Sequence, residues 1–190
     1  MTLVLIYKAT DRAGLTRFEP RPFWAAENFA RSGSAADPAK VPPGATLVHG
    51  VYATRESFVP FYFPPRDCPR FSIDARANEP SVPVLERWLA PMPRDAKRVI
   101  VFREADRAAL AAHAFSVYAF DARAFTKLPT GEFFADAAVE PISETRHQNA
   151  TASIEAAGWA VRFAADVEAI RRLRSEIQSA GVTRFSAEKI

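Results

Sequence analysis

The chain has 190 residues and a formal net charge of +3, with 48% hydrophobic and 25% charged residues. This length suits one domain with a full core, and the composition is ordinary for a folded globular protein. The charge is too mild to indicate nucleic-acid binding by itself, and no apolar run approaches the roughly 20 residues that span a bilayer. We therefore expect one domain over residues 1–190, with nucleic-acid and membrane partners disfavoured.

The N-terminus and the cysteine content favour a reducing compartment. Residues 1–8 lack the basic lead and the cleavage site of a secretion signal. Cys68 is the one cysteine of the sequence, so an internal disulfide is excluded. Together these features predict a cytoplasmic protein. Arginine greatly outnumbers lysine, which fits either anion recognition by guanidinium groups or a GC-rich coding bias.

The first part of the chain alternates apolar runs with prolines. The apolar residues 3–8 predict a buried strand. Two prolines within residues 15–22 argue against both a helix and an inner strand there. The aromatic side chains of residues 23–29 are compatible with one or two helical turns. Residues 30–44 are rich in Ser, Gly, Ala and Pro, which predicts a long surface loop.

An aromatic and proline-rich stretch, residues 47–70, is the most distinctive part of the sequence. It opens with residues 47–52, whose apolar and aromatic side chains favour a strand. The prolines that follow exclude a long helix or a central strand. Because so many rings would not be left in water, they must pack together. The stretch therefore predicts a rigid corner that serves either as a ligand wall or as part of the core.

The second part of the chain predicts strands interspersed with short helices. The apolar patterns indicate strands at 71–74, 98–102, 115–120, 139–142 and 159–163, and helices at 84–89, 105–112, 151–157 and 167–180. The last helix is the clearest, because its apolar residues recur on one face and Asp166 stands in the capping position. The order of elements predicts an α+β fold with a mixed, mainly antiparallel sheet, ending in this amphipathic helix.

Several kinds of functional site are disfavoured by the sequence. It has no glycine-rich phosphate loop and no serine on a nucleophile elbow. The three histidines, His49, His113 and His147, are too far apart to suggest a metal site, so we expect none. Cys68 follows an acidic residue, which disfavours an activated thiolate.

Two short strings suggest relatives. Residues 18–22 read FEPRP, and residues 65–70 read PRDCPR. This double signature resembles that of a family of small, functionally uncharacterised bacterial proteins. The likeness covers most of residues 3–75.

A looser resemblance is to the ADP-ribosyltransferase fold of toxins, poly-ADP-ribose polymerases and tRNA 2′-phosphotransferases. Three strings carry it: IYKAT at residues 6–10, GVYA at residues 50–53 and GEFF at residues 131–134. In that fold, three such motifs lie on three strands around the nicotinamide end of NAD. The resemblance implies an ADP-ribosyltransferase-like domain that uses NAD as a substrate and displaces nicotinamide.

The same resemblance assigns roles to individual residues. Tyr52 would stack on the nicotinamide ring, and Glu132 would stabilise the oxocarbenium-like centre as nicotinamide leaves. Lys8, where the fold usually has His or Arg, would donate to ribose or phosphate oxygens. Arg66 and Arg70 would hold the pyrophosphate. The full predicted site has catalytic members Lys8, Tyr52 and Glu132 and cofactor-binding members Arg66, Arg70, Thr10 and Gly50.

Each assignment has a structural alternative. Tyr52 is also typical of a half-buried strand residue, and Glu132 of an exposed turn. Arg66 and Arg70 would, with Asp67, also form a salt-bridge cluster at the proline-rich corner. The functional alternatives are a degenerate, non-catalytic relative that binds a nucleotide or a protein partner, and an RNA-processing enzyme of the 2′-phosphotransferase type.

Overall fold

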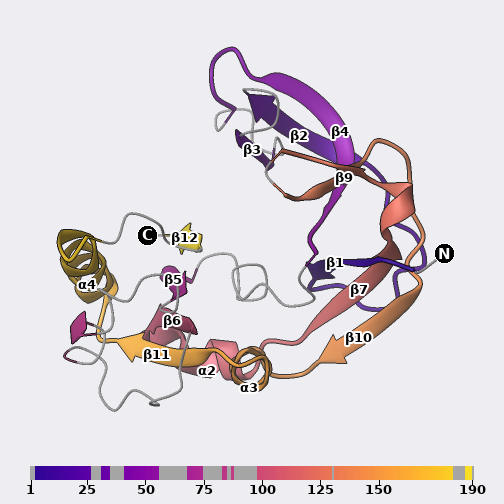
Figure 1. Ribbon diagram of the computed structural model, residues 1–190. Coiled ribbons are helices and arrows are strands. Elements are labelled where there is room, and N and C mark those ends of the chain that lie inside the picture. The colour runs from indigo at the N-terminus through magenta and orange to yellow at the C-terminus, as the bar shows by residue number, and fades with distance from the viewer. Residues whose placement is uncertain are drawn as a thin grey trace. The chain divides into compact units, whose positions relative to one another are not determined.

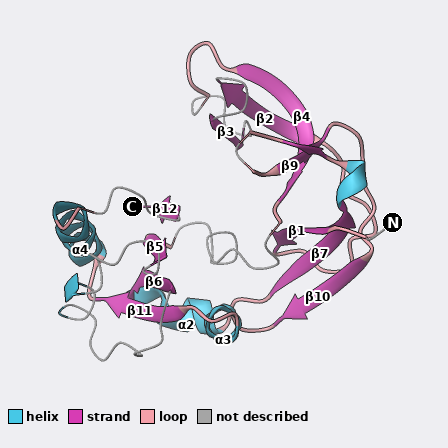
Figure 2. Cartoon of the chain, viewed as in Figure 1, coloured by secondary structure: helices cyan, strands magenta, loops and turns pink. Residues whose placement is uncertain are grey.

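The computed structural model describes residues 3–26, 31–34, 41–55, 68–74, 83–84, 87, 98–129, 131–181 and 187–189 (Figures 1 and 2). The chain divides into two compact units. Unit 1 comprises Met1–Ser57 and Ser116–Arg146, and unit 2 comprises Phe58–Phe115 and His147–Ile190. The chain therefore passes between the units three times. The expected single domain over residues 1–190 remains a prediction, and each unit is described by itself.

Unit 1 contains two sheets. The smaller has the strand order β1-β7-β10, with β7 between the other two strands (Figure 1). The larger has the order β3-β2-β4-β9-β8, and each of its neighbouring pairs is antiparallel. The strands are β1 (Leu5–Thr10), β2 (Arg21–Ala26), β3 (Arg31–Ser34), β4 (Thr46–Ala53), β7 (Phe115–Asp121), β8 (Thr126–Lys127), β9 (Phe133–Ala135) and β10 (Ser143–His147). A single 3-10 turn, η4 (Ala122–Ala124), follows β7.

The core of unit 1 is formed by alternate residues of its strands, because successive side chains of a strand point to opposite faces. On β4, Val51 and Ala53 are buried in a cluster to which β1 contributes Ile6. Phe18 packs edge-on against two rings of β7, with centroid distances of 4.9 Å and 5.2 Å. Tyr7 and Thr54 exchange two backbone hydrogen bonds of 2.7 Å and 2.8 Å, which join β1 to the residue that follows β4. These bonds bring the two sheets together at one end of β4.

Unit 2 is a four-stranded sheet covered by helices. Its strand order is β11-β6-β5-β12, and the β11–β6 pair is parallel. The elements are β5 (Arg70–Asp74), β6 (Arg98–Arg103), η3 (Glu104–Asp106), α2 (Arg107–Ala111), α3 (Ala150–Ala156), β11 (Ala160–Ala164), α4 (Val167–Ser179) and β12 (Ala187–Lys189). The buried face of α4 packs on Phe71, Val99 and Val101. Asp166 caps this helix by accepting a 2.7 Å hydrogen bond from the Ala169 N–H.

The predicted α+β class is confirmed, and so is the mainly antiparallel pairing, although the described strands form three sheets instead of one. The prediction for residues 15–26 is wrong in two respects, whereas residues 27–29 of the expected helical turns lie outside the described residues. Arg21–Ala26 is a strand with neighbours on both sides, where we expected a proline-barred segment and helical turns. Pro22 is tolerated because the pairing with β3 begins only at Phe23.

Two further expectations need correction. The predicted loop over residues 30–44 contains strand β3, which forms by pairing with β2. The predicted strand at 139–142 is reduced to an isolated bridge between Val139 and Phe18. The neighbouring Pro141 lacks the N–H that a continued ladder would need. The prediction of a helical turn over residues 84–89 falls mostly outside the described residues.

Candidate functional site

Two predicted catalytic residues meet where β1 approaches β4. The Lys8 Nζ donates a 3.0 Å hydrogen bond to the backbone oxygen of Tyr52. Lys8 follows Tyr7, which is bonded to Thr54, so the backbone pairing itself delivers the lysine side chain to the end of β4. The contact spans 44 residues of sequence. The structure therefore brings together Lys8 and Tyr52, which were assigned from two separate strings.

The surroundings of Lys8 disfavour its charged form. The side chain is half-buried, and this burial is the main cause that lowers the pKa of Lys8 to about 8. The positive charge of Arg21 lowers the pKa further, whereas the negative charge of Glu132 raises it. Arg21 and Glu132 therefore both lie within electrostatic reach of the amine. Within the described part of the chain, Lys8 forms no ion pair.

Glu132 is positioned by a tight turn ahead of β9. Leu128 N–H donates to the Glu132 backbone oxygen at 2.8 Å, and Gly131 N–H donates to the Leu128 oxygen at 2.9 Å. Gly131 has φ 86°, a conformation that favours glycine. Glu132 is half-buried and stands one residue before the strand, where we expected a glutamate on the strand. The Lys8 amine is thus bonded to the backbone of Tyr52 and is affected by the charge of Glu132.

Tyr52 belongs to an aromatic cluster formed by Phe23, Tyr52 and Phe134. The Tyr52 ring lies 4.4 Å from that of Phe23 and 5.2 Å from that of Phe134, centroid to centroid. Gly50 gives this cluster room, since a Cβ there would lie 2.0 Å from the Cε2 atom of Phe134. The space beside Gly50 is therefore filled by a phenylalanine ring. The Tyr52 ring is therefore already packed against two neighbouring rings.

The remaining predicted residues lie elsewhere. Thr10 ends β1, where its Oγ1 donates to Asp11 Oδ1 at 3.2 Å and accepts from the Arg12 N–H at 3.3 Å. Arg70 lies in unit 2, where it is buried and its Nη1 donates to the Cys68 oxygen at 2.7 Å. Burial is the main cause that lowers the pKa of Arg70 to about 10. Arg66 lies outside the described residues, so its assignment stays a prediction.

Sequence reasoning missed Arg21 as a neighbour of Lys8. Arg21 is exposed and pairs in register with Gly50, two residues before Tyr52 on β4. Its position in the FEPRP string was a signal, but the string alone does not say which residues it faces. The register of β2 against β4 supplies that information.

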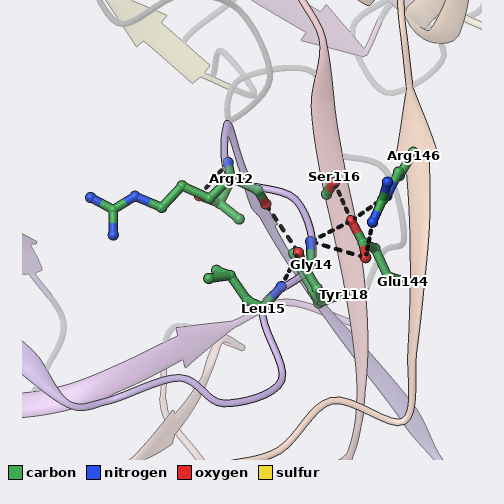
Figure 3. A network of polar contacts seen from close by, with 8 residues as sticks. Arg12, Gly14, Leu15, Ser116, Tyr118, Glu144 and Arg146 are labelled. Atoms are coloured by element: carbon green, nitrogen blue, oxygen red, sulfur yellow. Dashed lines mark hydrogen bonds and ion pairs between the residues drawn. The ribbon is translucent and has the colours of Figure 1, made fainter.

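It also missed Glu144, the centre of a polar network in unit 1 (Figure 3). Its carboxylate accepts from the Ser116 hydroxyl at 2.7 Å, from Arg146 Nε at 3.0 Å and from the Gly14 N–H at 3.1 Å. The bonds from Arg146 and then Ser116 are the largest causes that lower the pKa of Glu144 to about 2. Nearby, the Tyr118 hydroxyl donates to a backbone oxygen and accepts from a backbone N–H of the same loop. The network fixes the loop between β1 and β2 against β7 and β10.

In residues 3–189, gaps excepted, no group of three His, Cys, Asp or Glu side chains is arranged to hold a metal ion. None of the helices in that same part is both long enough and apolar enough to cross a bilayer.

Comparisons with known proteins assign the chain to a family, but they do not indicate which reaction or ligand the family is associated with. No curated protein and no solved structure matches it, so the resemblance to ADP-ribosyltransferases gains no support from relatives. One family model, described as a family of unknown function, matches residues 7–190. This agrees with the expectation of an uncharacterised family. The chain belongs to DUF6886, a family of unknown function.

Proposed function

We propose that unit 1 carries an ADP-ribosyltransferase-like site that binds NAD and displaces nicotinamide. The observation that supports this proposal is the hydrogen bond from the Lys8 amine to the Tyr52 backbone oxygen, together with the effect of the Glu132 charge on the pKa of that amine, because the three residues come from three distant strings of the sequence. In the reaction, the bond between nicotinamide and the ribose C1′ breaks and its electron pair leaves with nicotinamide. Water or an acceptor then attacks C1′, and the Glu132 carboxylate stabilises the positive charge that develops there.

The aromatic cluster favours a second candidate, a non-catalytic relative that binds a nucleotide. Phe23 and Phe134 already contact the Tyr52 ring, which leaves less of it for stacking on nicotinamide. Such a protein would still use Lys8 and Arg21 for a phosphate group. It would not need Glu132 for any chemical step.

Titration with NAD, ADP-ribose and nicotinamide separates the two candidates. A ligand that binds only the folded state raises the apparent melting temperature by mass action. We expect NAD to raise it and nicotinamide to be released, with Glu132→Gln lowering the release rate about 10²-fold or more. Glu140→Gln is the matched control, because Glu140 is an exposed glutamate of the same unit.

Binding of NAD or ADP-ribose without release would favour the non-catalytic candidate. No thermal shift with millimolar NAD or ADP-ribose, together with no release of nicotinamide, would refute both. If the Glu132→Gln variant releases nicotinamide as fast as the wild type does, the role assigned to this carboxylate is refuted.

A further inference from the structure

Strand β10 forms one edge of the smaller sheet of unit 1 (Figure 1). Among the described residues, β7 is the strand that pairs with it, and the arrows of the two strands run in opposite directions in Figure 1. The sequence of β10 is SETRH. Strand edges that are protected against pairing with another chain often carry lysine or proline, and β10 carries neither.

The hydrogen bonds of β7 indicate which backbone groups of β10 point to the open edge. The Ala119 oxygen accepts from the Ile142 N–H, so the backbone groups of Ala119 face β10. Because these groups alternate along a strand, those of Ser116 face the other way. The Ser116 hydroxyl donates to the Glu144 carboxylate at 2.7 Å, so the two side chains share one face of the sheet. In an antiparallel pair, residues that share a face also direct their backbone groups alike, so those of Glu144 and Arg146 point away from β7.

The side chains of this edge are complementary to those of a second copy of the same edge. Glu144 and Arg146 lie on either side of Thr145. If two copies pair antiparallel about a two-fold axis at Thr145, Glu144 of each copy lies opposite Arg146 of the other. Opposite charges in such positions stabilise a strand pair, and like charges destabilise it. An axis at Glu144 or at Arg146 would place like charges opposite each other, so the charges specify one register.

The two charged side chains have capacity for a second partner. Arg146 has a side chain that is 59% exposed, and its Nε donates to Glu144 of the same chain at 3.0 Å (Figure 3). A guanidinium has five N–H donors and can therefore bridge two carboxylates. The Glu144 Oε1 accepts bonds of 2.7, 3.0 and 3.1 Å, whereas the bonds to Oε2 are longer, at 3.2 and 3.3 Å. Oε2 is thus the atom that can accept from the second copy.

We propose that β10 is a homodimer interface, in which two copies of this chain pair antiparallel about Thr145 and the smaller sheet continues from one copy into the other. Glu144 of each copy exchanges backbone hydrogen bonds with Arg146 of the other, and their side chains form ion pairs. This interface goes beyond the proposed function and does not require NAD. A pair of short strands is small beside a standard interface of about 1,600 Å², so we expect dissociation at micromolar concentrations.

The first test measures the oligomeric state. Sedimentation of the full chain between about 1 µM and about 1 mM should show a dimer that dissociates on dilution. Thr145 is exposed, and Thr145→Lys would place two ammonium groups opposite each other at the axis. We expect this variant to weaken the dimer about tenfold or more. Thr126→Lys is the matched control, because Thr126 is an exposed threonine of strand β8 in the same unit.

A wild-type chain that stays monomeric at every concentration would overturn the proposal. So would an unchanged dimer in Thr145→Lys, or a dimer that both threonine variants weaken equally. A mixture gives a stricter result. Thr145→Glu should weaken the dimer as Thr145→Lys does, but the two variants mixed in equal amounts should dimerise more tightly than either alone, because opposite charges then meet at the axis. A mixture that dimerises no better than its components would refute pairing about Thr145.

The second test addresses the ion pairs. Arg146→Glu would place two carboxylates opposite each other on each side of the axis, which should weaken the dimer about tenfold or more. Arg123→Glu is the control, because Arg123 is likewise an exposed arginine of unit 1 and loses its own pairing with Asp121. An equal effect of both substitutions would contradict the role of Arg146 in the interface.

The third test determines the register by disulfide cross-linking. The backbone groups of Thr145 face β7, so the two Thr145 residues would form a non-hydrogen-bonded pair with Cα atoms about 4.5 Å apart, a separation that a disulfide spans. The two Ser143 residues would be about 13 Å apart. Oxidation should therefore cross-link Thr145→Cys at least about tenfold faster than Ser143→Cys. Cys68 is buried and common to both variants. Equal cross-linking would overturn the register.

Discussion

Replacing Lys8 by methionine tests the electrostatics of the site through the stability of unit 1. The folded state lowers the pKa of Lys8 from 10.5 to about 8. Between these two values the unfolded chain binds a proton that the folded chain has lost, so the free energy of unfolding rises as the pH rises through this window. Below pH 8 both states are protonated, and the folded state bears the cost of a half-buried ammonium group.

The expected size follows from the two pKa values. Each pKa unit corresponds to ~1.4 kcal/mol, so the full window is worth roughly 3.5 kcal/mol and the part between pH 7 and pH 10 about 2.5 kcal/mol. In Lys8→Met this contribution is absent at every pH. The difference in unfolding free energy, wild type minus variant, should therefore rise by about 2.5 kcal/mol from pH 7 to pH 10. The lost hydrogen bond to the Tyr52 oxygen shifts this difference by a constant and leaves its slope unchanged.

The measurement is urea unfolding at pH 7, 8, 9 and 10. Trp24 lies in unit 1, so a background with Trp88 and Trp159 replaced by phenylalanine makes fluorescence report on that unit. Lys127→Met is the control, because Lys127 is an exposed lysine of the same unit. A wild-type-minus-Lys8→Met difference that stays flat across this range would refute the assignment of a lowered pKa to Lys8.

Two other substitutions test the packing around Gly50 and the polar network of Glu144 in unit 1. Gly50→Ala should destabilise unit 1 by about 1–3 kcal/mol, because its Cβ would collide with the Phe134 ring. Urea unfolding should show that this penalty largely disappears in a Phe134→Ala background, and an equal penalty in both backgrounds would contradict the collision. Glu144→Gln should remove part of the acid sensitivity, because the stabilising effect of the low Glu144 pKa is present above the ordinary value of 4.5 and is lost as the pH falls toward about 2. Unfolding curves between pH 5 and pH 2.5 measure this, and parallel pH dependence in wild type and variant would count against the network.

The elements that the sequence predicted well are those with strong local patterns. Helix α4 has an apolar face, an aspartate cap and a glycine after its end, and all three act within one stretch of chain. Strands β6 and β7 are continuous runs of residues that favour strands. Strand β3, with the sequence RSGS, has no such pattern and exists because β2 offers it hydrogen bonds. Pairing with the preceding strand, and not a pattern of its own, decided its structure.

The candidate site likewise contains some residues that the sequence could identify and others that it could not. Lys8, Tyr52 and Glu132 could be named from strings that resemble known motifs, and the structure bonds the Lys8 amine to the Tyr52 backbone and places it under the influence of the Glu132 charge. Arg21 could not be assigned, because its closeness to Lys8 depends on the register between β2 and β4. Glu144 could not be assigned either, since its hydrogen-bond donors come from three separate segments. Sequence strings identify chemical groups, whereas strand register determines which of them meet.

The interleaved order of the two units has a consequence for the protein during its synthesis. Strand β4 is made early, yet its neighbour β9 lies beyond residue 130, after a large part of unit 2 has left the ribosome. Until then β4 has an open edge where β9 will pair, and Gly50 lacks the ring of Phe134. Open strand edges on a nascent chain invite pairing with other chains. Slower translation before residue 146 would therefore lengthen the interval in which unit 1 is exposed to aggregation, and chaperones that shield strand edges would act in that interval.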